Sequence, residues 1–166
     1  VKLQGVIYAN FTDGLVKQID VPAFWTRICG IDFGFTNPTA MVFIATDGDM
    51  YYIYDEHYQP GMHLSEIRDR LKMTALSNAY GDPSEAGTID ELKTSGIPID
   101  KADNDVLAGI FFVRQLIQDK KLIINPRCTN TRGEINKYSW DKDKGRPIKA
   151  FDHAMDGMRY GIMSSR

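Results

Sequence analysis

Long apolar runs, a nucleotide-binding loop and a cysteine framework are all missing from this chain. No stretch is long and apolar enough to cross a membrane, and no secretion signal or low-complexity tract is visible. The pattern Gly-x-x-x-x-Gly-Lys-Ser/Thr does not occur, which excludes ATP binding by a P-loop. Cys29 and Cys128 lie far apart and outside any zinc spacing, so we expect both to be small buried side chains in a reducing compartment.

An excess of either charge is missing too. The 20 Lys and Arg and 22 Asp and Glu residues leave a formal net charge of −2, which argues against coating nucleic acid by bulk electrostatics. An enzyme with an acidic site and local basic patches is still compatible with this balance. We expect residues 1–166, 43% of them hydrophobic, to form one domain. Because the chain opens with Val1 and soon reaches a strand-like pattern, we expect it to be part of a longer protein.

Strand-forming residues dominate the first third of the chain, where β-branched and aromatic side chains recur between turn signals. The expected strands cover residues 3–8, 26–33, 39–46 and 50–54. Because only short turns separate the last three, we expect them to form an antiparallel meander.

Helices and short strands alternate in the rest of the chain. Apolar spacing predicts helices over 64–75, 83–92, 106–117 and 151–163, the third capped by Asp103 or Asn104. Short strands are expected at 78–82, 97–99 and 122–125, with a polar hairpin or loop at 138–149. This order predicts an α/β fold in which helices flank a mixed sheet, made of the antiparallel meander and further parallel strands.

One carboxylate interrupts an apolar strand. Asp32 lies in the run Arg-Ile-Cys-Gly-Ile-Asp-Phe-Gly-Phe-Thr-Asn-Pro. Burying an unpaired carboxylate is costly, so such a residue is normally paired, hydrogen-bonded or bound to a cation. Gly30 and Gly34 on either side leave room for a close approach to the backbone. We expect a divalent metal, and behind it a nucleic-acid phosphate, to use that room.

Two further acids fall where they can join Asp32. Asp82 ends a later expected strand, and Asp156 lies on the closing helix. If that strand pairs with the first strand of the meander and the helix packs over both, the three carboxylates converge. Carboxylate oxygens suit Mg²⁺ or Mn²⁺, and two such ions can hold the attacking water and the leaving oxygen of a phosphodiester. Asp32 would then bridge both ions, and the other two acids would each complete one ion's shell.

Three motifs together resemble a known family. Gly-Ile-Asp-Phe-Gly with the following Asn-Pro, the pair Asp82-Pro83, and Asp-His-Ala-Met-Asp-Gly-Met-Arg-Tyr-Gly at 152–161 are similar to the nuclease domain of the large terminase subunit of tailed bacteriophages. That family belongs to the ribonuclease H-like superfamily. The first motif alone also occurs in sugar kinases and actin-like ATPases; the last is the most specific.

The resemblance implies a function and its setting. It implies an endonuclease that cuts double-stranded viral DNA during genome packaging, with Asp32, Asp82 and Asp156 as metal-binding acids. It further implies an ATPase motor domain in the same chain, a small terminase subunit and a portal protein as partners, and the cytoplasm of a bacterial host as the location, with no membrane association.

The closing helix carries residues whose role stays open. Asp152 could bind the metal or only cap the helix. His153 and Asp156 are three residues apart and adjacent on the helix surface, so His153 could orient the nucleophile, accept a proton, or only hydrogen-bond at the helix entrance. Arg159 could contact a phosphate or one of the acids.

Basic residues cluster in the expected hairpin, interleaved with Trp140 and two acids. They are Lys142, Lys144, Arg146 and Lys149. Such a loop could follow a DNA backbone by neutralising phosphates, and the resemblance favours this, although a solvated turn would look the same.

Several functions share these features. A ribonuclease H or a Holliday junction resolvase would carry the same acids but cut RNA/DNA hybrids or four-way junctions. A DNA-binding module without catalysis would use the acids only as structure. An actin-like ATPase would share only the first motif.

Overall fold

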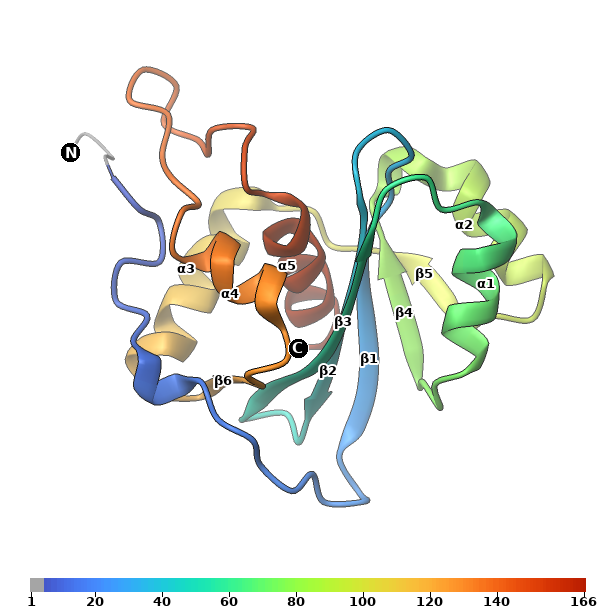
Figure 1. Cartoon of the computed structure of the whole chain (residues 1–166), viewed down its shortest axis with the longest axis horizontal. Helices are drawn as coiled ribbons and strands as arrows, with labels where there is room; N and C mark the ends of the chain where they lie inside the picture. Colours follow the sequence, from blue (N-terminus) through green and yellow to red (C-terminus); the bar gives the residue numbers. More distant parts are fainter. Residues whose placement is uncertain (1–4) are drawn as a thin grey trace.

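A six-stranded mixed sheet forms the centre of the computed structural model, which describes residues 5–166 (Figure 1). The strand order across the sheet is β5-β4-β1-β2-β3-β6. The strands are β1 (Thr26–Asp32), β2 (Thr39–Thr46), β3 (Tyr51–Gln59), β4 (Asn78–Gly81), β5 (Ile99–Lys101) and β6 (Leu122–Ile124).

The expected meander and the parallel additions are both present. Strands β1, β2 and β3 pair antiparallel in sequence order, while β4 pairs parallel with β1, β5 with β4, and β6 with β3. Every residue of β2 is buried, which explains its continuous apolar composition. The mixed sheet predicted from the sequence is therefore confirmed.

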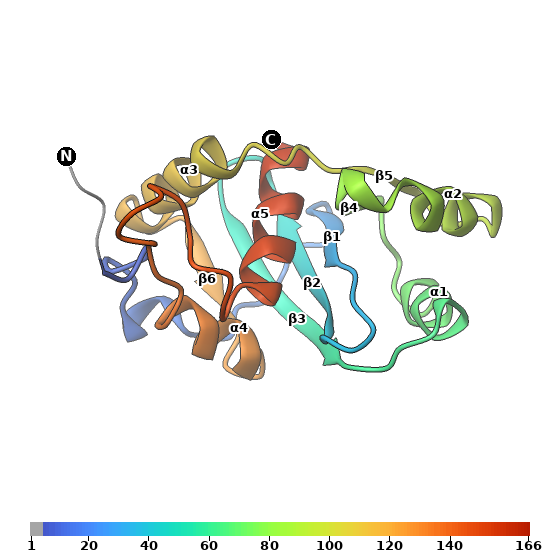
Figure 2. The same cartoon turned by 90° about the horizontal axis from the view of Figure 1, so that it is seen from above.

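Helices cover both faces of this sheet (Figures 1 and 2). One core cluster joins one face of the sheet to α1 and α2, and a larger cluster joins the opposite face to α3 and α5. The helical segments are η1 (Asp13–Leu15), α1 (Leu64–Lys72), η2 (Pro83–Glu85), α2 (Ala86–Thr94), α3 (Val106–Gln118), α4 (Thr129–Ile135) and α5 (His153–Ser165).

Side chains of β1 alternate between these two cores. Cys29 and Ile31 belong to the cluster with α1 and α2, whereas Ile28 belongs to the cluster with α5. Since successive strand residues point to opposite faces, Asp32 shares the α5 face with Ile28. The carboxylate of Asp32 can therefore be reached from α5 and not from α1 or α2, which lie on the opposite face.

Helix α5 approaches the sheet unusually closely through glycines. A Cβ atom on Gly30 would lie 1.7 Å from the carbonyl oxygen of Gly157 and 2.7 Å from the amide nitrogen of Gly161. At Gly34, a Cβ would meet the chain's own turn, 2.6 Å from the Asn37 carbonyl oxygen. The expectation that a metal and a phosphate use the space beside these glycines is therefore wrong: a helix and a turn fill it.

Several element boundaries differ from the sequence prediction. Among described residues 5–8, the expected first strand reduces to an isolated bridge between Val6 and Ser139; residues 3–4 lie outside the described part. Strand β3 continues to Gln59, and α4 was not predicted. Helix α3 begins at Val106 as predicted, but its cap is neither Asp103 nor Asn104: the residue directly before the helix is Asp105, whose Oδ1 accepts from the Ala108 amide at 3.1 Å.

Two further features bear on expectations from the sequence: the length of the helices and the burial of the cysteines. No helix within residues 5–166 is long and apolar enough to cross a membrane. Cys29 and Cys128 are both completely buried free thiols, as expected for small core side chains.

Candidate active site

Two of the three predicted acids lie at the carboxyl ends of adjacent parallel strands. Asp32 is the last residue of β1, and Asp82 directly follows the last residue of β4. Ile31 of β1 pairs with Gly81 of β4, so the two acids occupy the next position along both strands. Parallel pairing therefore brings together two residues that are 50 positions apart in the sequence.

The N-terminal turns of α5 bring the remaining predicted residues to the same end of the sheet. Nδ1 of His153 is hydrogen-bonded to Oδ2 of Asp32 at 2.9 Å. Asp156 lies one helical turn from Asp152 on the same helix. Seen from above in Figure 2, α5 crosses the sheet beside β1 at this end. The structure thus gathers the predicted acids and the histidine around the start of α5.

Each acid is also bound by a side chain of α5 or its own turn. Oδ1 of Asp156 accepts from Nη2 of Arg159 at 3.1 Å. Oδ2 of Asp82 accepts from the Tyr160 hydroxyl at 3.2 Å, and its Oδ1 accepts from the Ser84 amide at 2.9 Å. Of the two predicted roles for Arg159, the structure shows the contact with an acid.

The carboxylates disfavour one another's ionisation. The pKa of Asp32 is raised from 3.8 to about 7; burial is the largest cause, the hydrogen bond and charge of His153 oppose the rise, and the charges of Asp156 and Asp152 add to it. Burial likewise raises the pKa of Asp156 to about 6, with Asp152 adding to the rise and Arg159 opposing it. Clustered acids of raised pKa are frequent at functional sites.

Tyr160 lies close enough to three of the acids for their charges to affect the pKa of its hydroxyl. Burial raises the pKa of its hydroxyl, and the carboxylates of Asp156, Asp82 and Asp32 raise it further. The hydrogen bond to Asp32 and its charge raise the pKa of His153 despite burial. A group of acids surrounded by few cations would be stabilised by an added positive charge.

The donor chemistry fits a hard divalent cation. Asp32 and Asp156 keep 16% and 23% of their side-chain surface exposed, so solution can reach buried carboxylate oxygens that lack a full complement of positive charge. Within residues 5–166, however, no three His, Cys, Asp or Glu side chains already form a metal-ligand group. Carboxylates supply the ligands, while Arg159, Tyr160 and His153 currently hold some of their oxygens.

Asp152 occupies the N-cap position of α5 without performing the cap. In the described part of the chain its side chain makes no capping hydrogen bond; instead Oε1 of Glu134 accepts from the amides of Ala154 and Met155 at 2.8 and 3.2 Å. Oε2 of Glu134 accepts from the Tyr58 hydroxyl at 2.6 Å. The capping explanation for Asp152 therefore loses its support, and its carboxylate lies 4.0 Å from His153 Nδ1.

The basic loop projects from the molecule as a hairpin between α4 and α5 (Figure 1). Trp140 and Pro147 form an antiparallel bridge, and the Asp141 amide donates to the Arg146 carbonyl at 2.7 Å. The four basic side chains, Lys142, Lys144, Arg146 and Lys149, are all exposed. The expected hairpin is confirmed, whereas its contact with DNA stays a prediction.

A pocket connects this hairpin to the acids. It has a volume of about 330 Å³ and is lined by Arg146 and Lys149 of the hairpin, by Asp152 at the N-cap of α5, and by Asp156 and Arg159 of α5. Basic side chains that can contact phosphate therefore share one hollow with two of the predicted metal-binding acids.

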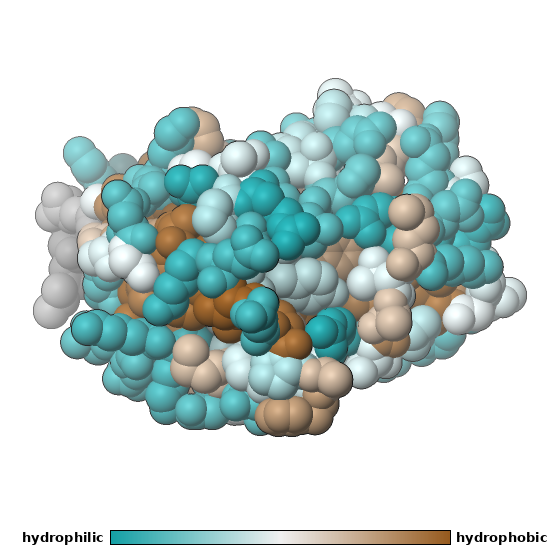
Figure 3. All heavy atoms as spheres, turned by 60° about the horizontal axis from the view of Figure 1, so that its bottom comes forward, coloured by the Kyte–Doolittle hydropathy of each residue, from teal (hydrophilic) through white to brown (hydrophobic). Residues whose placement is uncertain are grey.

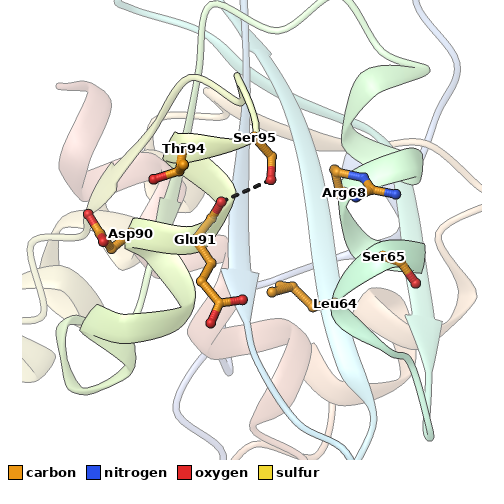
Figure 4. Close-up of a pocket in the computed structure, with 7 residues that line it drawn as sticks. All are labelled: Leu64, Ser65, Arg68, Asp90, Glu91, Thr94 and Ser95. Atoms are coloured by element: carbon orange, nitrogen blue, oxygen red, sulfur yellow. Dashed lines mark hydrogen bonds between the residues drawn. The ribbon is translucent and has the colours of Figure 1, made fainter.

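Other hollows offer less chemistry. A pocket of about 350 Å³ between α1 and α2 (Figure 4) contains Asp90 and Glu91, but Glu91 engages Ser95 only through its carbonyl. In the view of Figure 3, a patch of hydrophobic side chains interrupts a largely hydrophilic surface. The residues that line the pocket between α1 and α2 include no predicted site residue.

Sequence reasoning missed two residues that organise the site. Glu134 lies on α4, a short helix with few apolar positions, so no periodic signal marked it. Tyr160 is part of the most specific motif and lies four residues after Asp156, a spacing that places both on one helix face. The spacing of Tyr160 from Asp156 could have been used to predict Tyr160, whereas the sequence holds no signal for Glu134.

These features define a domain of ribonuclease H-like fold. The chain belongs to the family described as the terminase RNase H-like domain, which matches residues 29–165. It is 28% identical over 160 residues to the large terminase subunit of Escherichia phage T5, covering 87% of this chain and 36% of that protein. The chain thus spans little more than a third of the length of this relative.

Solved structures agree with this assignment. The large terminase of a thermophilic bacteriophage superimposes with a TM-score of 0.87 and 27% identity, over 99% of this chain and 45% of that chain. The large terminase nuclease domain of bacteriophage SPP1, solved with bound Mn, gives a TM-score of 0.78 and 25% identity over the full length of both chains. The family resemblance inferred from the motifs is confirmed.

Proposed function

We propose that this domain is a divalent-metal-dependent endonuclease that cuts double-stranded DNA, as part of a large terminase subunit. The observation that carries the proposal is the convergence of Asp32, Asp82 and Asp156 around the start of α5. The Mn bound in the SPP1 nuclease domain, which matches this chain over its full length, supports a metal role for acids of this fold.

The proposed metal ligands are Asp32, Asp82 and Asp156, with Asp152 as a further candidate. Bound Mg²⁺ or Mn²⁺, two ions in this proposal, would supply a water of lowered pKa and positive charge beside the leaving 3′ oxygen. His153 holds Asp32 through Nδ1, which leaves Nε2 as the nitrogen able to orient the nucleophile or accept its proton. No covalent link between protein and DNA is needed.

Substrate binding is assigned to the hairpin. Arg146 and Lys149 line the pocket that also contains Asp156, so DNA phosphates bound by them would lie next to the acids. Lys142 and Lys144 are exposed on the same hairpin but do not line that pocket. Backbone contacts of this type carry no sequence information, so we expect cleavage with little sequence preference.

The wider assembly is part of the same proposal. Because the chain spans 36% of the T5 protein and 45% of the thermophilic phage terminase, an ATPase motor domain in the same polypeptide is proposed to deliver the DNA. A small terminase subunit, a portal protein and the bacterial cytoplasm during phage assembly complete this setting.

The direct test is nicking of supercoiled plasmid in the presence of Mn²⁺. We expect Asp32→Asn to abolish nicking while circular dichroism and thermal melting show a folded protein, because the substitution removes one charge without changing side-chain size. Asp90→Asn, an equally conservative change at an exposed acid of the pocket between α1 and α2, should cut like the parent. Retained nicking by Asp32→Asn would show that the proposed site is wrong.

The choice of substrate separates the remaining functions. Duplex DNA should be cut, whereas preferential cutting of an RNA/DNA hybrid would indicate a ribonuclease H and of a four-way junction a resolvase. Binding of DNA without Mn²⁺-dependent cutting would indicate a module without catalysis.

A further inference from the structure

Helix α5 supplies a separate partner for each of the three acids. His153 binds Asp32, Arg159 binds Asp156, and Tyr160 binds Asp82. Arg159 and Tyr160 are consecutive, so their side chains leave the helix about 100° apart. Helix α5 contacts both α3 and β4. Because the two side chains diverge, Arg159 can bind Asp156 on α5 itself while Tyr160 binds Asp82, which follows β4.

Arg159 is fixed at both ends of its guanidinium. Nη2 donates to Oδ1 of Asp156 at 3.1 Å, and Nη1 donates to Oδ1 of Asn104 at 3.0 Å. The residue is 3% exposed, and its stem packs against Gly109, where a Cβ atom would lie 2.7 Å from both Cγ and Cδ. A guanidinium held in this way cannot swing out to solvent, so it presents a fixed donor to Asp156.

Tyr160 is fixed by burial and by its neighbour. It is 3% exposed, its hydroxyl donates to Oδ2 of Asp82 at 3.2 Å, and the guanidinium carbon of Arg159 lies 5.0 Å from the centre of its ring. The Ser84 amide holds the other oxygen of Asp82. The orientation of this carboxylate is therefore determined by two donors on different elements.

We infer that Arg159 and Tyr160 are positioning residues, which orient the carboxylates of Asp156 and Asp82 for metal binding. The inference rests on the proposed function and extends it to residues that do not themselves bind the metal. Hydrogen-bond partners that orient metal ligands typically contribute about 10–100-fold to metal affinity. Because α5 is packed in a fixed position, Arg159 and Tyr160 give the carboxylates of Asp156 and Asp82 a defined orientation, although the two acids come from different elements.

The test measures Mn²⁺ binding directly, by the loss of the free-ion signal in electron paramagnetic resonance. Tyr160→Phe removes only the hydroxyl, and Arg159→Lys keeps the charge but loses the planar pair of donors. We expect each to weaken Mn²⁺ binding by about 10-fold or more. Nicking by Tyr160→Phe should recover when the Mn²⁺ concentration is raised in proportion.

The matched control is Tyr52→Phe. The Tyr52 hydroxyl is also buried, and it accepts hydrogen bonds from Asn125 Nδ2 at 2.7 Å and from the Ile19 amide at 3.3 Å, away from the acids. This variant should melt at a lower temperature yet bind Mn²⁺ like the parent. Binding by Tyr160→Phe and Arg159→Lys within twofold of the parent would overturn the inference, whereas a parent that binds no Mn²⁺ would overturn the proposed function itself.

Discussion

Asp32 shows at the scale of one residue how a site and a stable fold make opposite demands. Burial and neighbouring acids raise its pKa to about 7, against 3.8 for an exposed aspartate. Ionised Asp32 is what a metal needs, but in the folded protein its ionisation costs free energy. Under the proposed function, stability is given up at this position in exchange for a metal ligand.

This conflict predicts a pH dependence of stability. Between about pH 4 and pH 7 the folded state holds a proton on Asp32 that the unfolded state has lost, so stability should fall as the pH rises through this window. Asp32→Asn cannot ionise. At pH 8, in a chelator, we expect it to be more stable than the parent by on the order of 2 kcal/mol, or about 4–8 °C in melting temperature.

The comparison at low pH is the internal control. Near pH 4 the folded parent is protonated at Asp32, and the pH is close to the ordinary pKa of 3.8 that applies in the unfolded parent, so ionisation favours the unfolded state only slightly and most of the advantage of Asp32→Asn should disappear. Melting followed by circular dichroism from pH 4 to pH 8 measures both limits. An equal advantage at the two pH values would mean that hydrogen bonding at His153, and not ionisation, determines the effect.

At the scale of elements, the position of α5 depends on a contact between backbones. Gly30 on β1 faces Gly157 and Gly161 on α5, and no side chain separates the strand from the helix. Because the helix lies this close, His153 can hydrogen-bond to Asp32, and the charge of Asp156 adds to the effect of burial in raising the pKa of Asp32. The glycine that the motif places two residues before Asp32 is thus required for packing.

Gly30→Ala should therefore displace α5 or unfold the domain. Its Cβ would lie 1.7 Å from the Gly157 carbonyl oxygen, a backbone atom that cannot rotate away. We expect a loss of about 3 kcal/mol or more in the free energy of unfolding, measured by urea denaturation.

Gly87→Ala on α2 is the matched control for this change. A Cβ there has nothing within 4 Å, so the replacement should be neutral or stabilise the helix by up to about 1 kcal/mol. Equal stability of the two variants would show that α5 can shift without cost.

The elements also show why some of the site was predictable and some was not. Strands β1 and β2 and helix α5 carry strong local signals, whereas β4 carries a weak one, so the meeting of Asp32 with Asp82 could be anticipated only on the condition that β4 pairs with β1, as it does. Glu134 could not be: it caps α5 from a helix of seven residues that has no apolar periodicity.

The prediction that a metal and a phosphate occupy the space beside the glycines was wrong for a related physical reason. From the sequence, a glycine indicates only that something comes close to the backbone. Whether a ligand, a helix or a turn comes close depends on contacts between distant segments. Gly30 lies against the backbone of α5, and Gly34 lies against the backbone of the turn that follows it. Neither contact could be recognised from the types of residue in the sequence.

At the scale of the whole molecule, a net charge of −2 means that the proposed DNA binding requires a local basic surface. The hairpin is the element that the proposal assigns to this role, and its four basic side chains are exposed. Replacing Lys142, Lys144, Arg146 and Lys149 together by Gln should weaken binding to duplex DNA of any sequence. We expect the slope of log affinity against log salt to decrease by about 0.9 for each phosphate that is no longer neutralised.

A second variant with the same net charge distinguishes a local surface from overall charge. Replacing the exposed Lys17, Lys72, Lys93 and Lys120 by Gln changes the net charge equally, from −2 to −6 in both cases, since four positive charges are removed. Fluorescence anisotropy with a labelled duplex at several salt concentrations gives both slopes. If the hairpin holds the DNA, only the first variant loses the salt dependence; if both lose it equally, long-range charge and not the hairpin brings DNA to the acids.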